Sequence, residues 1–188
     1  MMPVGRLTRL AVLTQAGLAG VALAGASVAG LPVRWGSERP AMAIGLGLAV
    51  AAALAAINLV LLHRPSGPWR RVRVAVDEVL VPTFSALTSW QMVVVAVAAG
   101  IGEELFFRGW LQPLLGLPAA SVAFGLAHVA GPRMLAFGVW AMGMGVVMGG
   151  LALFTGGLLA SMTAHACYDI LAFHYLSAEA RRHRKQGA

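Results

Sequence analysis

Ionisable side chains stand at helical spacings in otherwise apolar parts of this 188-residue sequence. Glu104 and Arg108 are four residues apart, so a helix places them on one face, where the guanidinium can hold the carboxylate. Glu103 is then left without a cation partner. A carboxylate in that situation is a stronger base in a low-dielectric site than in water, because burial disfavours its charged form. It can take a proton from water near neutral pH.

Two histidines extend this pattern further along the chain. His128 follows Phe124 by four residues and Asp169 follows His165 by four, so each pair shares a helical face. One histidine on an apolar helix is more often a satisfied core residue than a catalyst. Several ionisable groups at membrane depth each need a polar partner, and the simplest arrangement brings them together in one central cavity. The alternative is a buried ionic cluster that only ties helices together.

The composition places these residues in a membrane. Hydrophobic residues make up 59% of the chain and charged residues only 11%, whereas charged residues make up about 25% of a soluble domain. A helical span needs roughly 20 apolar residues. The apolar stretches are 10–33, 41–62, 89–115, 117–130, 135–154 and 156–176. We therefore expect an all-α, polytopic transmembrane helical bundle with about six membrane segments and a polar catalytic cavity. The fourth segment is short enough to be partly re-entrant or buried.

These segments divide the chain into three parts. Residues 1–88 hold two transmembrane helices, a basic loop and an amphipathic segment at 74–87. Residues 89–176 form the predicted catalytic membrane core, and residues 177–188 form a basic tail.

The basic residues predict an orientation, because positive residues in short loops tend to stay cytoplasmic. They gather in four groups, which are Arg6 and Arg9; Arg64, Arg70, Arg71 and Arg73; Arg133; and Arg181, Arg182, Arg184 and Lys185. All four groups fall on one side of the membrane if there are six spans and both termini are cytoplasmic. The net charge of +7 then serves topology and contact with anionic lipid. The sequence has no basic face with interleaved aromatic residues, so it does not indicate nucleic-acid binding.

The three polar patterns together resemble the CPBP intramembrane proteases, also called the Abi family. This family includes type II CAAX prenyl endopeptidases and bacteriocin-processing enzymes. The pattern Glu-Glu-x-x-x-Arg stands at 103–108, Phe-x-x-x-His at 124–128 and His-x-x-x-Asp at 165–169. The resemblance covers about 91–176, and the first two spans contribute nothing to it.

The resemblance implies a glutamate-dependent mechanism without a catalytic metal or another cofactor. Glu103 and His128 would activate the water that attacks the scissile carbonyl, and His165 with Asp169 would stabilise the oxyanion. The supporting residues would be Glu104, Arg108 and Phe124.

Asp169 departs from the type II CAAX endopeptidases, which usually have asparagine at this position. An ionised aspartate cannot donate a hydrogen bond to an oxyanion. Asp169 is therefore either protonated or an acceptor that orients His165, and we favour the second.

A cavity among membrane spans suits a membrane-anchored peptide or protein substrate. Prenylated CAAX tails, bacteriocin leaders and C-terminal sorting helices all fit, and the compact chain favours a processing peptidase of the bacterial cytoplasmic membrane. Two other interpretations stay open. One is a zinc metalloprotease, although the sequence has no His-Glu-x-x-His motif. The other is a non-catalytic immunity protein, scaffold or small carrier.

Overall fold

The computed structural model describes residues 4–63 and 66–186, and over these residues it is helical and contains no strand. Two long helices come first, α1 (Val4–Val28) and α2 (Pro40–His63). Three short segments follow, α3 (Pro68–Ala75), η1 (Val76–Leu80) and α4 (Val81–Phe84). The remaining elements are α5 (Ser89–Glu104), η2 (Leu105–Leu111), α6 (Gln112–Ala127), η3 (Pro132–Met134), α7 (Leu135–Thr155) and α8 (Leu159–Gln186). The prediction of an all-α bundle is confirmed.

Each of the six predicted membrane segments corresponds to a helix, although two of them are joined. Four helical stretches in the described part of the chain are long and apolar enough to cross a membrane: Val4–Val28, Pro40–His63, Ser89–Ala127 and Pro132–Thr155. The third stretch contains two predicted segments, because the chain turns back at Gly116, whose φ is 80°. The part of α6 after this turn rises about 16 Å, well short of a hydrocarbon core of about 30 Å.

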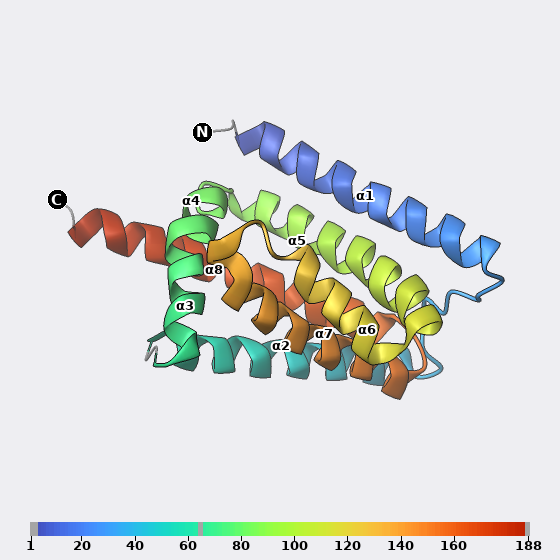
Figure 1. Ribbon diagram of the computed structural model, residues 1–188. Coiled ribbons are helices and arrows are strands. Elements are labelled where there is room, and N and C mark those ends of the chain that lie inside the picture. The colour runs from blue at the N-terminus through green and yellow to red at the C-terminus, as the bar shows by residue number, and fades with distance from the viewer. Residues whose placement is uncertain (1–3, 64–65, 187–188) are drawn as a thin grey trace.

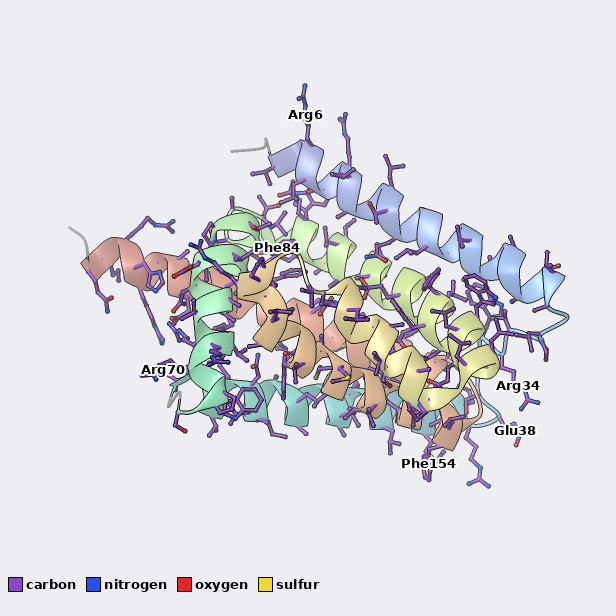
Figure 2. The ribbon with its side chains drawn as sticks, viewed as in Figure 1. Arg6, Arg34, Glu38, Arg70, Phe84 and Phe154 are labelled. Carbon is purple, nitrogen blue, oxygen red and sulfur yellow. The ribbon has the colours of Figure 1, made fainter. Side chains whose placement is uncertain are left out.

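The first turn of α1 and the last turns of α8 lie at the same end of the bundle (Figure 1). The helix that begins as α3 lies across that end, and it carries the amphipathic segment predicted at 74–87. Arg6 and Arg70 are at this end, whereas Arg34 and Glu38 are at the opposite end (Figure 2). Arg64 lies outside the described residues. The cytoplasmic assignment of this end stays a prediction.

α5 lies between α1 and α8, and glycines allow both neighbours to approach it closely. A Cβ on Gly102 would come within 2.5 Å of the backbone oxygen of Gln15 on α1. A Cβ on Gly100 would come within 3.0 Å of Ala166 on α8. The two glutamates that follow these glycines therefore stand between two closely packed helices.

An ionic cluster ties α3 to α8 at the end of the bundle where α1 begins and α8 ends. The Arg73 guanidinium contacts Asp77 at 2.7 Å, donates to the Tyr175 hydroxyl at 2.8 Å and pairs with Glu179. Burial alone would raise the pKa of Glu179, but hydrogen bonds and charge interactions with Arg73 and Arg182 outweigh burial and lower it. The cluster fixes the short helix across the end of the spans.

Candidate active site

Glu104 and Arg108 form the predicted ion pair inside the bundle. Glu104 is the last residue of α5, and Arg108 lies in the π-helical segment η2 that continues it. The Nη1 atom of Arg108 is 2.9 Å from Oε1 of Glu104, and both side chains are buried. Arg108 also donates from Nη2 to the backbone oxygen of Gly145 at 3.2 Å, and its guanidinium lies 4.3 Å from the Phe124 ring centroid. The pair thus joins α5, α6 and α7.

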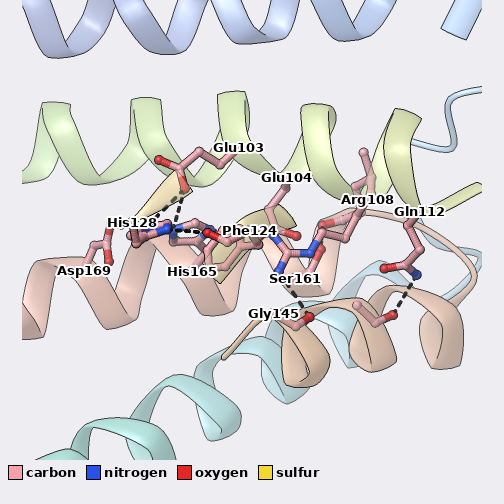
Figure 3. Close-up of polar contacts among 12 residues, drawn as sticks. Glu103, Glu104, Arg108, Gln112, Phe124, His128, Gly145, Ser161, His165 and Asp169 are labelled. Atoms are coloured by element: carbon pink, nitrogen blue, oxygen red, sulfur yellow. Dashed lines mark hydrogen bonds and ion pairs between the residues drawn. The ribbon is translucent and has the colours of Figure 1, made fainter. Parts of the chain in front are cut away.

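Glu104 also holds His165 of α8 in a fixed orientation. The His165 Nδ1 atom is 2.9 Å from Oε1 of Glu104. Because an ionised carboxylate only accepts, Nδ1 carries the hydrogen in this bond. The opposite nitrogen, Nε2, is then directed towards Glu103 at 3.9 Å and Asp169 at 3.7 Å. Glu104 therefore serves two buried partners at once (Figure 3).

Glu103 is held through only one of its two oxygens. Its Oε1 accepts a hydrogen bond of 2.8 Å from Nε2 of Gln15. Its Oε2 is buried without a hydrogen-bond partner and lies 3.8 Å from Nε2 of His128. Figure 3 shows this carboxylate above both imidazole rings. One oxygen is therefore fixed, and the other faces two ring nitrogens.

His128 stands directly after α6, where the helix ends. Its Nδ1 is 2.8 Å from the backbone oxygen of Phe124. A carbonyl oxygen only accepts, so Nδ1 carries the hydrogen and Nε2 holds the lone pair of the neutral ring. The Phe124 ring centroid is 4.5 Å from that of His128 and 5.9 Å from that of His165. Phe124 thus packs against both histidines.

A small cavity of about 60 Å³ lies beside these rings. It is lined by Phe124, His128, Phe137, Ala141, Met144, Met148, His165, Tyr168 and Asp169. The structure therefore gathers all seven residues singled out in the sequence in or next to one cavity.

Asp169 lies beside His165, and its role as an acceptor that orients the ring stays a prediction. Its Oδ2 is 3.7 Å from Nε2 of His165, which is too long for a hydrogen bond. The residue that forms a hydrogen bond with His165 is Glu104. The spacing of four residues along α8 brings Asp169 near the His165 ring. The Nδ1 atom of that ring faces α5, where the carboxylate of Glu104 binds it.

Sequence reasoning missed two polar contacts from the first two helices. Gln15 of α1 donates to Glu103, and Asn58 of α2 donates to the Tyr168 hydroxyl at 3.1 Å. Their only signal in the sequence is a polar side chain in an apolar span. The N-terminal helices therefore contribute directly to the surroundings of the cavity.

The site combines three carboxylates, one arginine and two histidines. Arg108 compensates Glu104, so Glu103 and Asp169 remain for chemistry with the two Nε2 atoms. Imidazole nitrogens and carboxylate oxygens are also the ligand types of zinc. In the described residues, Asp77, Glu179 and His183 form a second cluster of such groups, but Arg73 already pairs with both of its carboxylates.

Comparison with known proteins finds one family match. Residues 85–171 match the family model described as type II CAAX prenyl endopeptidase Rce1-like. The matched region contains every site residue described above except Gln15 and Asn58. No curated protein and no solved structure matches the chain.

Proposed function

We propose that the protein is an intramembrane endopeptidase of the glutamate type. It cleaves a peptide bond near a membrane-anchored or lipidated terminus of its substrate. The proposal starts from the match of residues 85–171 to the Rce1-like type II CAAX prenyl endopeptidases, which are CPBP proteins. The observation that carries the proposal is the free Oε2 of Glu103, which is buried opposite the Nε2 atoms of His128 and His165.

Glu103 and His128 together activate the attacking water. The 3.8 Å between their facing atoms is too long for a direct hydrogen bond. One water between them can donate a hydrogen to each, since Oε2 and the neutral Nε2 are both acceptors. The water oxygen attacks the scissile carbonyl carbon while its proton passes to Glu103. The proton then reaches the amine nitrogen as the C–N bond breaks, which leaves a carboxyl and an amine product.

His165 stabilises the oxyanion formed by that attack. Its Nδ1 already donates to Glu104, so donation from Nε2 requires a ring that is protonated at both nitrogens. The Glu104 carboxylate stabilises this imidazolium in the way that a carboxylate orients and supports histidine in other sites. Asp169 borders the cavity 3.7 Å from Nε2 and limits the orientation of the ring from the other side.

Two further contacts position these groups. Arg108 neutralises Glu104, so the site does not hold two unpaired adjacent carboxylates. Gln15 fixes Oε1 of Glu103 and leaves Oε2 directed at the histidines. Catalytic groups need such supporting contacts, because small displacements of a reacting atom lower the rate strongly.

The substrate is proposed as a class only. The cavity among α6, α7 and α8 measures only about 60 Å³, so it holds the attacking water and the reacting group rather than a whole peptide. Its place among membrane helices suits a cleavage site that lies beside a hydrophobic anchor. Prenylated tails, bacteriocin leaders and C-terminal sorting helices belong to this class. We place the enzyme in the bacterial cytoplasmic membrane with both termini cytoplasmic; the orientation is supported by Arg6, Arg70 and the basic last turn of α8, which lie at the end of the bundle where α1 begins and α8 ends.

The test compares wild type with Glu103→Gln in native membranes by mass spectrometry of C-terminal peptides, with and without a chelator. Glu78→Gln is the matched control, since Glu78 is exposed on η1 and pairs with Arg133 outside the cavity. Processed termini should disappear only in Glu103→Gln and persist with chelator. Peptide sets that are identical in all three proteins contradict the proposal.

Two other functions make different predictions in the same experiment. A zinc metalloprotease would use the histidine and carboxylate donors of this cavity, although in the described residues the donor atoms that all lie within 4.8 Å of one another are those of Asp77, Glu179 and His183; chelator would then abolish processing. A non-catalytic scaffold is favoured by the closed network of Glu104, Arg108 and His165, which joins α5, α7 and α8. The scaffold predicts no processed terminus in any variant.

A further inference from the structure

A second and much larger hollow lies away from the catalytic cavity. It is a groove of about 800 Å³ between α3 and the start of α7. Its lining is Pro68, Trp69, Arg70, Arg71, Val72, Val74, Pro132, Arg133, Leu135, Ala136, Val139 and Trp140. We call it the α3–α7 groove. It lies at the end of the bundle where α1 begins and α8 ends and where Arg6 and Arg70 are found.

The charge of the α3–α7 groove is positive. Arg70, Arg71 and Arg133 line it, and no carboxylate is among its lining residues. Glu78 is a neighbour, with its Oε2 3.5 Å from Nε of Arg133 across an exposed contact. Arg70 and Arg71 have no ion-pair partner within the described residues. The groove therefore presents uncompensated guanidinium groups, which suit a phosphate because guanidinium binds its oxygens in a fork.

The rest of the groove is apolar and open. Val74, Leu135 and Val139 are exposed by 41%, 58% and 63%. Trp69 and Trp140 form one wall in an edge-to-face contact, with ring centroids 5.0 Å apart. Tryptophan concentrates at the boundary between membrane and water, and exposed valine and leucine beside it are positioned to contact acyl chains. A soluble anion would use only the arginines and leave this surface without a partner.

The helix that contributes the arginines has the character of an interfacial helix. It lies across the end of the bundle rather than along it (Figure 1). Val72 and Ala75 face inwards and are buried, while Arg70, Arg71 and Val74 are exposed. An amphipathic helix of this kind lies in the plane of the membrane surface. Its arginines are then at the depth of lipid phosphates.

We propose that the α3–α7 groove binds an anionic phospholipid, whose phosphate lies between Arg70, Arg71 and Arg133 and whose acyl chain lies along Leu135 and Val139. Basic pockets between membrane helices are known to bind lipid head groups. The groove and the catalytic cavity use different faces of α7. Ala136, Val139 and Trp140 line the groove, whereas Phe137, Ala141 and Met144 line the cavity. Lipid binding can therefore be tested without altering the proposed catalytic residues.

The test is native mass spectrometry of the purified protein with phosphatidylglycerol or phosphatidylcholine that carry the same acyl chains. Wild type should retain one phosphatidylglycerol in a saturable manner and should retain phosphatidylcholine weakly. The double variant Arg70→Ala/Arg71→Ala should lose affinity for phosphatidylglycerol by roughly tenfold or more. The matched control is Arg181→Ala/Arg184→Ala, which removes the same charge from the exposed end of α8 outside the groove.

Three results would overturn the proposal. One is equal retention of the two lipids by wild type. Another is an equal loss of affinity in the control double variant, which would indicate a general effect of charge. The third is full displacement of phosphatidylglycerol by glycerol 3-phosphate, which would make the site a phosphate site rather than a lipid site. Intrinsic tryptophan fluorescence and size-exclusion chromatography verify that each variant is folded before the lipids are added.

Discussion

Glu103 and Glu104 are neighbours in the sequence but stand in opposite environments. Glu104 is fully buried, and its Oε1 binds both Arg108 and His165 at 2.9 Å. Oε2 of both carboxylates is buried without a hydrogen-bond partner, but Oε1 of Glu103 binds only the neutral amide of Gln15, and the Glu103 side chain is 13% exposed. The difference follows from their directions on α5, since Glu104 faces α8 and Glu103 faces α1 and the end of α6. The closed half of this polar cluster holds helices together, and the open half is free to meet water and substrate.

Apart from the two glutamates themselves, the largest effect should come from His128, whose Nε2 faces Glu103. His128→Gln removes the proposed acceptor of the water hydrogen, so turnover should fall by roughly 10²–10⁴-fold, the usual contribution of a general acid or base. Rates are measured on the substrate found by peptide mass spectrometry. His183→Gln is the control, because His183 is exposed near the end of α8. Turnover of His128→Gln at the wild-type rate would remove this residue from the mechanism.

Arg108 belongs to the closed half, and its loss should affect folding as well as activity. Arg108→Ala leaves the Glu104 carboxylate buried without its guanidinium, and an unpaired buried charge costs about 3–5 kcal/mol. Thermal unfolding in detergent and the yield of folded protein measure this cost.

Adding Glu104→Leu to the Arg108→Ala variant should recover much of the lost stability without restoring activity, because it removes the uncompensated charge. Wild-type stability of the single variant would mean that the pair contributes nothing to the fold.

Gln15 lies outside the matched residues 85–171, yet its side chain holds Oε1 of Glu103, the proposed reactive carboxylate. Gln15→Leu removes one hydrogen bond to a charged group, worth about 1.5–3 kcal/mol, so kcat should fall by roughly 10–100-fold while KM changes little. Steady-state kinetics separates the two constants. Gln15→Asn gives a shorter amide and should recover part of kcat if its reach suffices. A change in KM alone would assign Gln15 to substrate binding.

The smallest effect concerns Glu179 at the end of the bundle, far along α8 from the cavity. Its pKa in the folded protein is lowered by Arg73 and Arg182 against the opposing effect of burial. The stabilisation is therefore fully present above its unfolded pKa of about 4.3 and is lost as pH falls through the lower folded value.

Glu179→Gln should consequently lower Tm at pH 7, and the difference from wild type should shrink towards pH 3. Thermal unfolding at the two pH values measures it. A constant difference between the two proteins would mean that the Glu179 charge does not contribute.

The sequence was sufficient for the helices and for the identity of the gathered side chains. Apolar stretches bounded by arginines predicted the spans, and spacings of four residues predicted the pair of Glu104 with Arg108. Gly116 could not be recognised as the turning point, because many other glycines in the chain are accommodated within helices.

Contacts between helices were beyond sequence reasoning, because spacing along one helix does not determine which neighbour faces it. Glu104 is the hydrogen-bond partner of His165 since α5 and α8 approach closely at Gly100. Gln15 reaches Glu103 since α1 lies against Gly102. Both contacts depend on the packing of elements that are distant in the chain.

The most direct test of the central claim measures cleavage rate and Tm of Glu103→Gln and Glu104→Gln side by side. The two variants make the same chemical change at adjacent positions. We predict that Glu103→Gln loses cleavage and keeps the Tm of wild type. Glu104→Gln should lose cleavage and also unfold at a lower Tm than wild type. Cleavage at the wild-type rate in Glu103→Gln, or an equal fall of Tm in the two variants, would contradict the division into an open catalytic half and a closed structural half.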